Sequence, residues 1–269
     1  MQKNGKSLDR RTFLKTTAAG IGAAAAAASI AGGESAAAPQ AGGAKPDPAK
    51  LIWRSKSPDM AYARLGRTNF MVSRVVSGLG GSAGSPDMWR RELQRGVNYF
   101  DTARGYGNSE VNIKEFLKEF RNDLWITSKA TDIAGYGRID PDVRKLYIEA
   151  MKKFLGDVDF AKVEGQPGPK AKEKDLLDLL RFHRAAVAKQ KATGEKPDLR
   201  PAGKRMAELY LAQLDESLGR MGIDHVDSYF IHGVEIPWFF DCPEVWEAYE
   251  KAHKAGKAKH FGFSVHTHH

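Results

Sequence analysis

Residues 214–232 have the sequence LDESLGRMGIDHVDSYFIH, in which an apolar helical stripe is followed by a short apolar strand. The stripe runs from Met206 to Met221 with apolar residues every three or four positions, and Gly222 then ends the predicted helix. Residues 226–231 have the length and content of a buried strand. A helix that leads directly into a buried strand predicts an α/β fold.

The same alternation extends to both sides of this unit. Further strands are predicted at 74–79, 97–101, 124–129 and 259–264, and further helices at 86–95, 109–120 and 243–255. Strands that alternate with helices imply a parallel sheet with right-handed crossovers. This leaves two fold classes, a doubly wound sheet and a (β/α)8 barrel.

One glycine motif favours the doubly wound sheet. Residues 78–83, GLGGSA, match the pattern G-x-G-x-x-A between a strand and a helix, and Asp101 ends the next strand where a ribose-binding acid would lie. A lone glycine pattern is weak evidence, because glycines are common wherever a strand turns tightly. The residues at the other strand ends therefore decide between the two folds.

Polar side chains with suitable chemistry follow three successive predicted strands. Asp101, Lys129 and His232 close strands two, three and four, and Tyr106 lies in the loop after strand two. Hydride transfer to a carbonyl carbon leaves negative charge on the oxygen, which then needs a proton donor. A tyrosine, with an ordinary pKa of about 10, can donate that proton if a neighbouring ammonium stabilises the phenolate.

Tyr106 and Lys129 fit these two roles, and Asp101 can hold the ammonium in place and offset the cost of burying it. His232 can donate a hydrogen bond to the carbonyl oxygen and orient it. In a barrel these strand ends share one rim, where barrel enzymes place their active sites. Each residue alone has an ordinary structural explanation, such as a surface lysine or a helix-capping aspartate, but four such accidents would have to coincide.

Several blocks, in this order, resemble the aldo/keto reductase family. They are YARLGRT at 62–68, DTARGYGNSE at 101–110, WITSK at 125–129, the stretch 214–232 quoted above, and GKAKHFGFS at 256–264. In the same order, the family's corresponding elements are the hairpin that closes the bottom of the barrel, the end of the second strand, the third strand, the third helix with the fourth strand, and the fifth strand. The resemblance spans 62–132 and 205–264, and its combination of motifs is far more specific than the glycine pattern.

This resemblance implies a TIM-barrel type α/β fold and a reductase that uses NADPH, or NADH, to convert a small aldehyde or ketone into an alcohol, or the reverse. The catalytic residues that it implies are Asp101, Tyr106, Lys129 and His232. The cofactor-binding residues that it implies are Gly80, Gly81 and Ser82 at the nicotinamide pocket, Asp101 at the ribose, and Ser264 at the carboxamide. The family often has Asn after that serine, where this chain has Val265.

Only five barrel strands are predicted, whereas a closed barrel of this type needs eight. The family's basic residues for the adenosine 2′-phosphate follow the fifth strand, and the sequence ends at His269. We therefore expect residues 59–269 to form an incomplete barrel, truncated after the fifth strand, whose first and fifth strands are unpaired edges. Two alternative functions stay open, a non-catalytic nicotinamide-binding regulatory relative and an inactive fragment.

Residues 133–204 are predicted to be a helical insertion after the third strand. One helix begins at Asp140 and Pro141 and has apolar positions as far as Phe154, and a second spans 172–191, with a Gly- and Pro-rich segment at 165–169 between them. The pair could cover the outside of the barrel, or it could cover substrate at the rim, since loops on that rim vary freely.

The N-terminal segment is predicted to be a targeting signal. Arg10 and Arg11 precede a weakly apolar, alanine-rich run at 16–31, and SAAA at 35–38 offers a cleavage site. This order resembles a twin-arginine signal peptide over 1–38, followed by a linker over 39–58, and predicts export to the periplasm by the twin-arginine machinery. The run is too short and alanine-rich for a convincing membrane span.

Composition excludes several other classes. The chain has 269 residues, 42% hydrophobic and 28% charged, which is typical of a globular protein. The single cysteine, Cys242, excludes an intrachain disulfide and a CxxC site. The net charge of +9 lies mainly in the leader and in residues 161–205, so no nucleic-acid partner is expected, and HTHH at 266–269 makes a poor metal site.

Overall fold

The computed structural model describes residues 47–81, 84–133, 139–156, 171–234 and 241–265. The chain divides into two compact units, residues 1–51 and 52–269. The described part of the first unit holds a short 3-10 helix, η1 (Pro48–Lys50), whose cap is the side chain of Asp47. The predicted signal peptide at 1–38 lies outside the described residues.

Five parallel strands of the second unit form one sheet in the order in which they occur along the chain. They are β3 (Ser77–Gly78), β4 (Tyr99–Asp101), β5 (Trp125–Ala130), β6 (Val226–Ile231) and β7 (Ala258–Phe263). A doubly wound sheet reverses its strand order at a switch point, whereas a (β/α)8 barrel adds each strand beside the last. The fold is therefore α/β of the TIM-barrel type, with a parallel sheet of five strands in the described residues.

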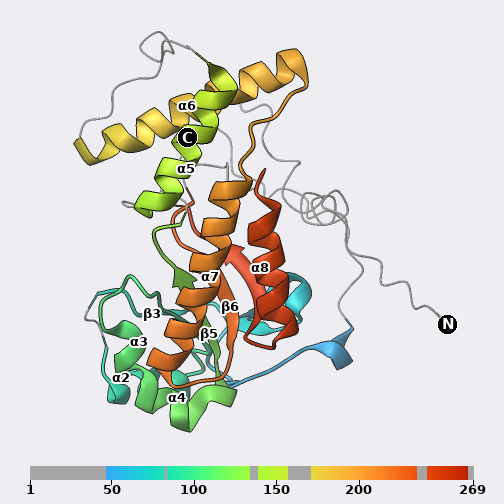
Figure 1. The fold of residues 1–269 in the computed structure, drawn as a ribbon. Helices are drawn as coiled ribbons and strands as arrows, with labels where there is room; N and C mark the ends of the chain where they lie inside the picture. The colour runs from blue at the N-terminus through green and yellow to red at the C-terminus, as the bar shows by residue number, and fades with distance from the viewer. Residues whose placement is uncertain (1–46, 82–83, 134–138, 157–170, 235–240, 266–269) are drawn as a thin grey trace, which may run out of the picture. The chain divides into compact units, whose positions relative to one another are not determined.

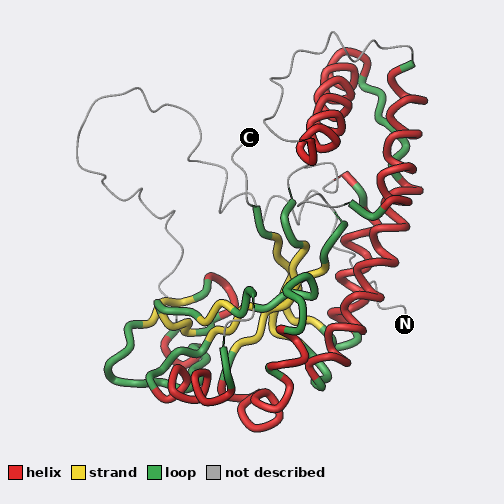
Figure 2. Tube along the Cα trace, turned by 90° about the vertical axis from the view of Figure 1, so that its left-hand side faces the viewer, coloured by secondary structure: helices red, strands yellow, loops and turns green. Residues whose placement is uncertain are grey.

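Helices connect these strands, and most of them cover one side of the sheet (Figures 1 and 2). They are α2 (Pro86–Gln94), α3 (Ser109–Asn112), α4 (Lys114–Phe120), the 3-10 helix η3 (Arg121–Asp123), α5 (Pro141–Leu155), α6 (Ala171–Thr193), α7 (Arg200–Met221) and α8 (Pro243–Lys254). The core lies between helices and sheet, where Phe100, Phe116, Leu214, Tyr229 and Val245 are completely buried. Most of these residues belong to the predicted helices and strands, where they are among the apolar residues.

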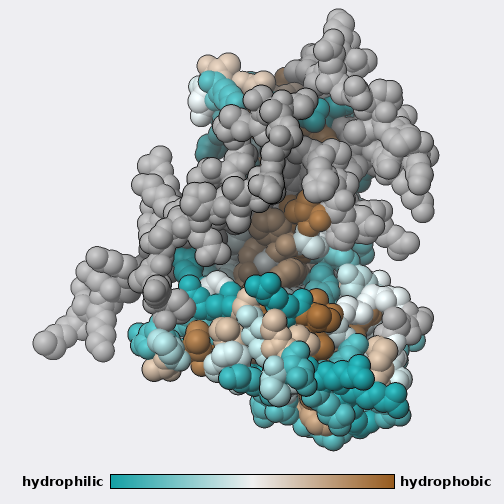
Figure 3. Space-filling model, turned by 180° about the vertical axis from the view of Figure 1, so that it is seen from behind, coloured by the Kyte–Doolittle hydropathy of each residue, from teal (hydrophilic) through white to brown (hydrophobic). Residues whose placement is uncertain are grey.

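The two outer strands are edges within the described residues, as expected from the strand count. β3 pairs only with β4, and β7 pairs only with β6. The strand predicted at 74–79 is reduced to two residues, because Val75 and Val76 have no partner strand and are about half exposed. In the space-filling view from behind, apolar atoms gather in the middle of the face and hydrophilic atoms dominate its lower part (Figure 3).

A hairpin covers the amino-terminal end of the sheet, as the stretch 62–68 predicts. Its strands are β1 (Tyr62–Arg64) and β2 (Met71–Ser73), with the 3-10 helix η2 (Gly66–Thr68) between them. The buried Asn98 binds it to the sheet, since its amide donates to the carbonyl oxygens of Arg54 at 2.8 Å and Met71 at 2.9 Å. Its side-chain oxygen accepts from the Ser73 amide at 2.9 Å. The Asn98 backbone amide donates to the Ser73 hydroxyl at 3.1 Å, and β4 begins at Tyr99, two residues after the predicted start at Val97.

Two helices differ from the sequence prediction. The helix predicted at 109–120 divides at Ile113 into α3 and α4. α7 begins at Arg200, six residues before the predicted start at Met206. The helix includes Gly203, where the start of α8 leaves no room for a side chain, since a Cβ on Gly203 would lie 3.0 Å from Cδ of Glu244 and 3.2 Å from Cβ of Cys242. The last residues of the predicted insertion thus form the first turns of α7.

The remainder of the predicted insertion forms the helices α5 and α6, which lie beyond the carboxyl ends of the strands (Figure 1). Asp140 caps α5 by accepting from the amides of Asp142 and Val143. α5 packs against both α6 and α7. The connecting segment at 165–169 lies outside the described residues.

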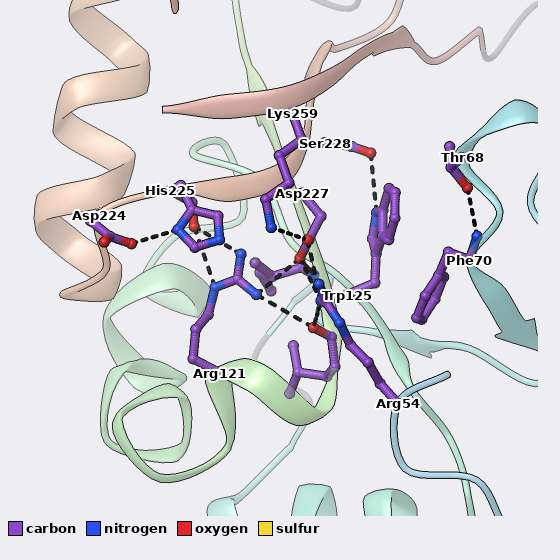
Figure 4. A network of polar contacts seen from close by, with 12 residues as sticks. Arg54, Thr68, Phe70, Arg121, Trp125, Asp224, His225, Asp227, Ser228 and Lys259 are labelled. Carbon is purple, nitrogen blue, oxygen red and sulfur yellow. Dashed lines mark hydrogen bonds and ion pairs between the residues drawn. The ribbon is translucent and has the colours of Figure 1, made fainter. Parts of the chain in front are cut away.

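A buried carboxylate gathers three cations at the amino-terminal end of the sheet (Figure 4). Asp227 is fully buried on β6 and contacts Arg121 at 2.9 Å, Arg54 at 3.2 Å and Lys259 at 3.2 Å. It also accepts from the Ile126 amide at 3.1 Å. Burial opposes ionisation of Asp227, but the two arginines outweigh it and hold its pKa below the ordinary value. One charged side chain therefore joins β6, β7, the start of η3 and the segment before the hairpin.

Candidate active site

The four candidate catalytic residues lie at adjacent carboxyl ends of the sheet. Asp101 is the last residue of β4, Lys129 is the penultimate residue of β5, and His232 directly follows β6. Tyr106 lies in the connection between β4 and α3. Parallel pairing of β4 with β5 and of β5 with β6 places these ends side by side. The structure thus brings together the residues that the sequence predicts.

Lys129 is at the centre of this group. Its ammonium donates to Asp101 Oδ1 and, at 2.8 Å, to the carbonyl oxygen of Thr102. The same nitrogen lies 3.5 Å from the phenolic oxygen of Tyr106. Burial lowers the pKa of Lys129, and the neighbouring Asp101 carboxylate partly offsets this by favouring the ammonium. The ammonium is thereby held between a carboxylate and a phenol, with only 4% of the residue exposed.

His232 packs against Tyr106 from the other side of the group. The two rings meet edge to face, with centroids 5.4 Å apart and an angle of 85° between their planes. His232 is buried, and its backbone amide donates to the Ala130 carbonyl at 2.9 Å, which continues the pairing of β5 with β6 past the strand end. The phenol after β4, the ammonium on β5 and the imidazole after β6 therefore lie in one place.

Three of the predicted cofactor-binding residues can be located around this group. A Cβ on Gly80 would lie 3.8 Å from Cε2 of Tyr106, so the segment that follows β3 approaches the tyrosine ring. Gly81 has φ +74°, a backbone conformation that glycine adopts readily, and a Cβ there would meet nothing. Ser264, after β7, accepts from the amide of Gly233 at 2.9 Å, next to His232. Ser82 lies outside the described residues.

Two further residues fix the strand ends and were missed by the sequence reasoning. Gln213 on α7 accepts from the Thr131 amide at 2.8 Å and donates to the Thr131 carbonyl at 3.0 Å, just past Lys129. Ser109 donates to the Leu79 carbonyl at 2.8 Å. Gln213 stands next to Leu214 of the apolar helical stripe, and this was the only signal in the sequence. A side chain that hydrogen-bonds the backbone past a strand end, as Gln213 does, leaves no periodic pattern.

The described residues include neither a cluster of metal-ligating side chains nor a helix suited to span a membrane. Among those residues, no three or more His, Cys, Asp or Glu side chains gather as metal ligands would. The same residues include no helix with the length and apolar content of a membrane span. The predicted poor metal site at 266–269 lies outside them.

Comparison with protein families gives a match over the C-terminal part of the chain. Residues 192–269 match the model of the Aldo/keto reductase family. This segment includes His232 and Ser264, while Asp101, Tyr106 and Lys129 precede it.

Several solved aldo/keto reductases are similar to the chain. A putative aldo-keto reductase from Pseudomonas aeruginosa is 17% identical, with 76% of this chain and 59% of that chain covered and a TM-score of 0.45. The holo form of an aldo-keto reductase from Bacillus halodurans is 20% identical, with 77% and 50% covered and a TM-score of 0.44. One from Brucella melitensis is 18% identical, with 77% and 55% covered and a TM-score of 0.43. The chain spans between half and three fifths of these structures.

Proposed function

We propose that the chain belongs to an aldo/keto reductase that reduces an aldehyde or ketone, or oxidises the corresponding alcohol, with a nicotinamide cofactor. The observation that carries the proposal is the placement of the Lys129 ammonium between Asp101 and the phenolic oxygen of Tyr106. The family match over 192–269 supports it independently, because that segment supplies His232 at the same rim.

The four side chains have distinct parts in this reaction. Tyr106 donates its phenolic proton to the carbonyl oxygen, because negative charge develops there as hydride reaches the carbon. Lys129 lies close enough to stabilise the resulting phenolate, and Asp101 keeps the ammonium charged and in position. His232, packed against Tyr106, orients the carbonyl oxygen.

The residues around the group fit the nicotinamide end of NADPH or NADH, which supplies the hydride when bound. Gly80 brings bare backbone next to Tyr106, and Gly81 has a φ of +74° that glycine adopts readily and leaves open space where a side chain would lie. In this proposal Ser82 joins these glycines at the nicotinamide, Asp101 contacts the ribose and Ser264 binds the carboxamide.

The test is to add NADPH and NADH to the purified protein and to measure binding separately from turnover. Binding would be followed by quenching of tryptophan fluorescence, and turnover by loss of nicotinamide absorbance with a panel of small aldehydes and ketones. Saturable binding with turnover would support the proposal. Binding without turnover would favour the regulatory alternative, and absence of both would favour the inactive one.

We further propose that the protein is exported to the periplasm by the twin-arginine machinery. Changing both Arg10→Lys and Arg11→Lys should block export, because the receptor reads the guanidinium pair and charge alone does not replace it. The measurement is the periplasmic fraction of the protein in a bacterial host. Lys3→Arg with Lys6→Arg, which also preserves charge, is the matched control, and normal export of the Arg10 and Arg11 variant would refute the assignment.

A further inference from the structure

The loop that carries Tyr106 is attached to helix α7 on both sides of the tyrosine. Before it, Arg104 donates to Glu216 at 2.7 Å. After it, Arg220 donates to the carbonyl oxygen of Gly107. Glu216 and Arg220 stand one helical turn apart and approach each other to 3.9 Å. Tyr106 therefore lies between two anchors that share one rigid helix.

A buried carboxylate attaches the same loop to the strand that carries Lys129. Glu110 is fully buried and forms an ion pair with Arg220 at 3.2 Å. Its other oxygen accepts from the Ser128 hydroxyl at 2.6 Å. Burial of a carboxylate is costly unless it is paired and hydrogen-bonded, and here the two partners come from α7 and β5. Glu110 thus links the loop, the helix and the strand beside Lys129.

The flanking sequence makes such anchors necessary. Gly105 and Gly107 lie on either side of Tyr106, and Gly107 has φ +61°. Glycines give a loop more conformational freedom than any other residue. A tyrosine between two glycines keeps its phenol near Lys129 only if the neighbouring backbone is held.

We infer that Glu110 and Arg220 are positioning residues, which hold the 104–110 loop so that the phenol of Tyr106 stays at Lys129. This rests on the proposed function for its catalytic meaning, but the positioning itself is a property of the folded chain. Neither residue touches the reacting atoms, and both act through Tyr106 and Lys129.

The charge of Glu110 also acts on Lys129. The titratable groups that face the Lys129 site are Asp101 from β4, Tyr106 from its loop, Glu110 from α3 and His232 after β6. Burial lowers the pKa of Lys129, while Asp101 and, more weakly, Glu110 raise it. Removing the charge of Glu110 should therefore lower the pKa of Lys129 further, so that the ammonium is lost at a lower pH.

The test compares three variants of the full chain. The double variant, Glu110→Gln with Arg220→Gln, removes both charges and leaves no unpaired buried charge. Arg220→Lys keeps the positive charge but loses the planar guanidinium group. Asp215→Asn is the control. Asp215 is an exposed carboxylate on the same helix that pairs with Lys257 at 2.5 Å, away from the loop. Thermal melts establish that each variant is folded before it is compared.

Two measurements need no turnover. Hydrogen exchange of the Tyr106 and Ser109 amides should become about tenfold faster in the double variant, as loss of a charge-assisted contact predicts. The pH midpoint for acetylation of Lys129 should shift downward in the double variant and stay unchanged in Arg220→Lys. Arg220→Lys should accelerate exchange alone, because it keeps the pairing charge for Glu110.

If the wild type is active, kcat of the double variant should fall more than KM changes, and the alkaline limb of its pH profile should move to lower pH. A folded double variant with wild-type exchange and a wild-type Lys129 midpoint would overturn the inference. Hydrogen exchange and the Lys129 midpoint are both measured on the folded chain, so they test the positioning role even if the wild type proves inactive. An inactive wild type would count against the proposed function only.

Discussion

Replacement of Tyr106 by Phe is expected to lower kcat by about 10²- to 10⁴-fold, the usual contribution of a general acid. The phenolic oxygen, 3.5 Å from the Lys129 ammonium, is removed, while the ring that packs against His232 and Gly80 is kept. Cofactor affinity should therefore change little, since the phenol is required for proton transfer and the glycine backbone for binding. Steady-state kinetics and a fluorescence titration with NADPH measure the two effects separately.

Tyr99→Phe is the matched control. Tyr99 lies on β4 two residues before Asp101, and its phenol accepts from Thr127 at 2.8 Å. Burial raises its pKa to about 12, and no contact joins it to the Lys129 ammonium in the described structure. The Tyr99 variant should keep its kcat. Near wild-type turnover by the Tyr106 variant would remove that residue from the proposed role.

Replacement of Asp227 by Ala should have the largest effect on stability, about 3–5 kcal/mol of unfolding free energy. The three cations that now meet on Asp227 would be left close together without their common carboxylate. Urea denaturation measures the effect. Asp224→Ala is the control. Asp224 lies just before β6, its side chain is 91% exposed, and among the described ion pairs it contacts only His225.

This effect should depend on pH in a defined direction. The folded-state pKa of Asp227 is depressed, so its contribution is fully present above the unfolded-state pKa of about 3.9 and is lost as the pH falls through the lower folded value. The stability difference between wild type and Asp227→Ala should therefore be constant near neutrality and shrink in acid. A difference that grows in acid would contradict the assigned role of the carboxylate.

The sequence predicted the fold class and the meeting of the four side chains for one physical reason. Parallel strands of alternating α/β units end at one edge, so Asp101, Lys129 and His232 could be placed together from strand positions alone. Their catalytic roles stay a prediction. The sequence could not show that Asn98 would bind the hairpin or that Arg220 would reach Gly107. Those contacts join segments distant in sequence through single side chains, which leave no periodic signal.

The sequence also misplaced the start of α7. Gly203 is unfavourable within a helix, and the close approach of α8 explains why a glycine stands at this helical position. The shortness of β3 likewise depends on the exposure of Val75 and Val76 at the sheet edge. Both differences come from tertiary packing that overrides local preference.

The strand order has a consequence for how the site assembles. β4 and β5 are joined by residues 102–124, but β5 and β6 are joined by residues 131–225, which include α5, α6 and α7. Each doubling of the length of a flexible connection adds only about 0.6 kcal/mol to the free-energy cost of closing it. The longer crossover therefore lowers the stability of the fold only slightly. Its effect is on rate, because contacts distant in sequence form more slowly. The pairing that brings His232 to Tyr106 and Lys129 should therefore form after Asp101 and Lys129 have met.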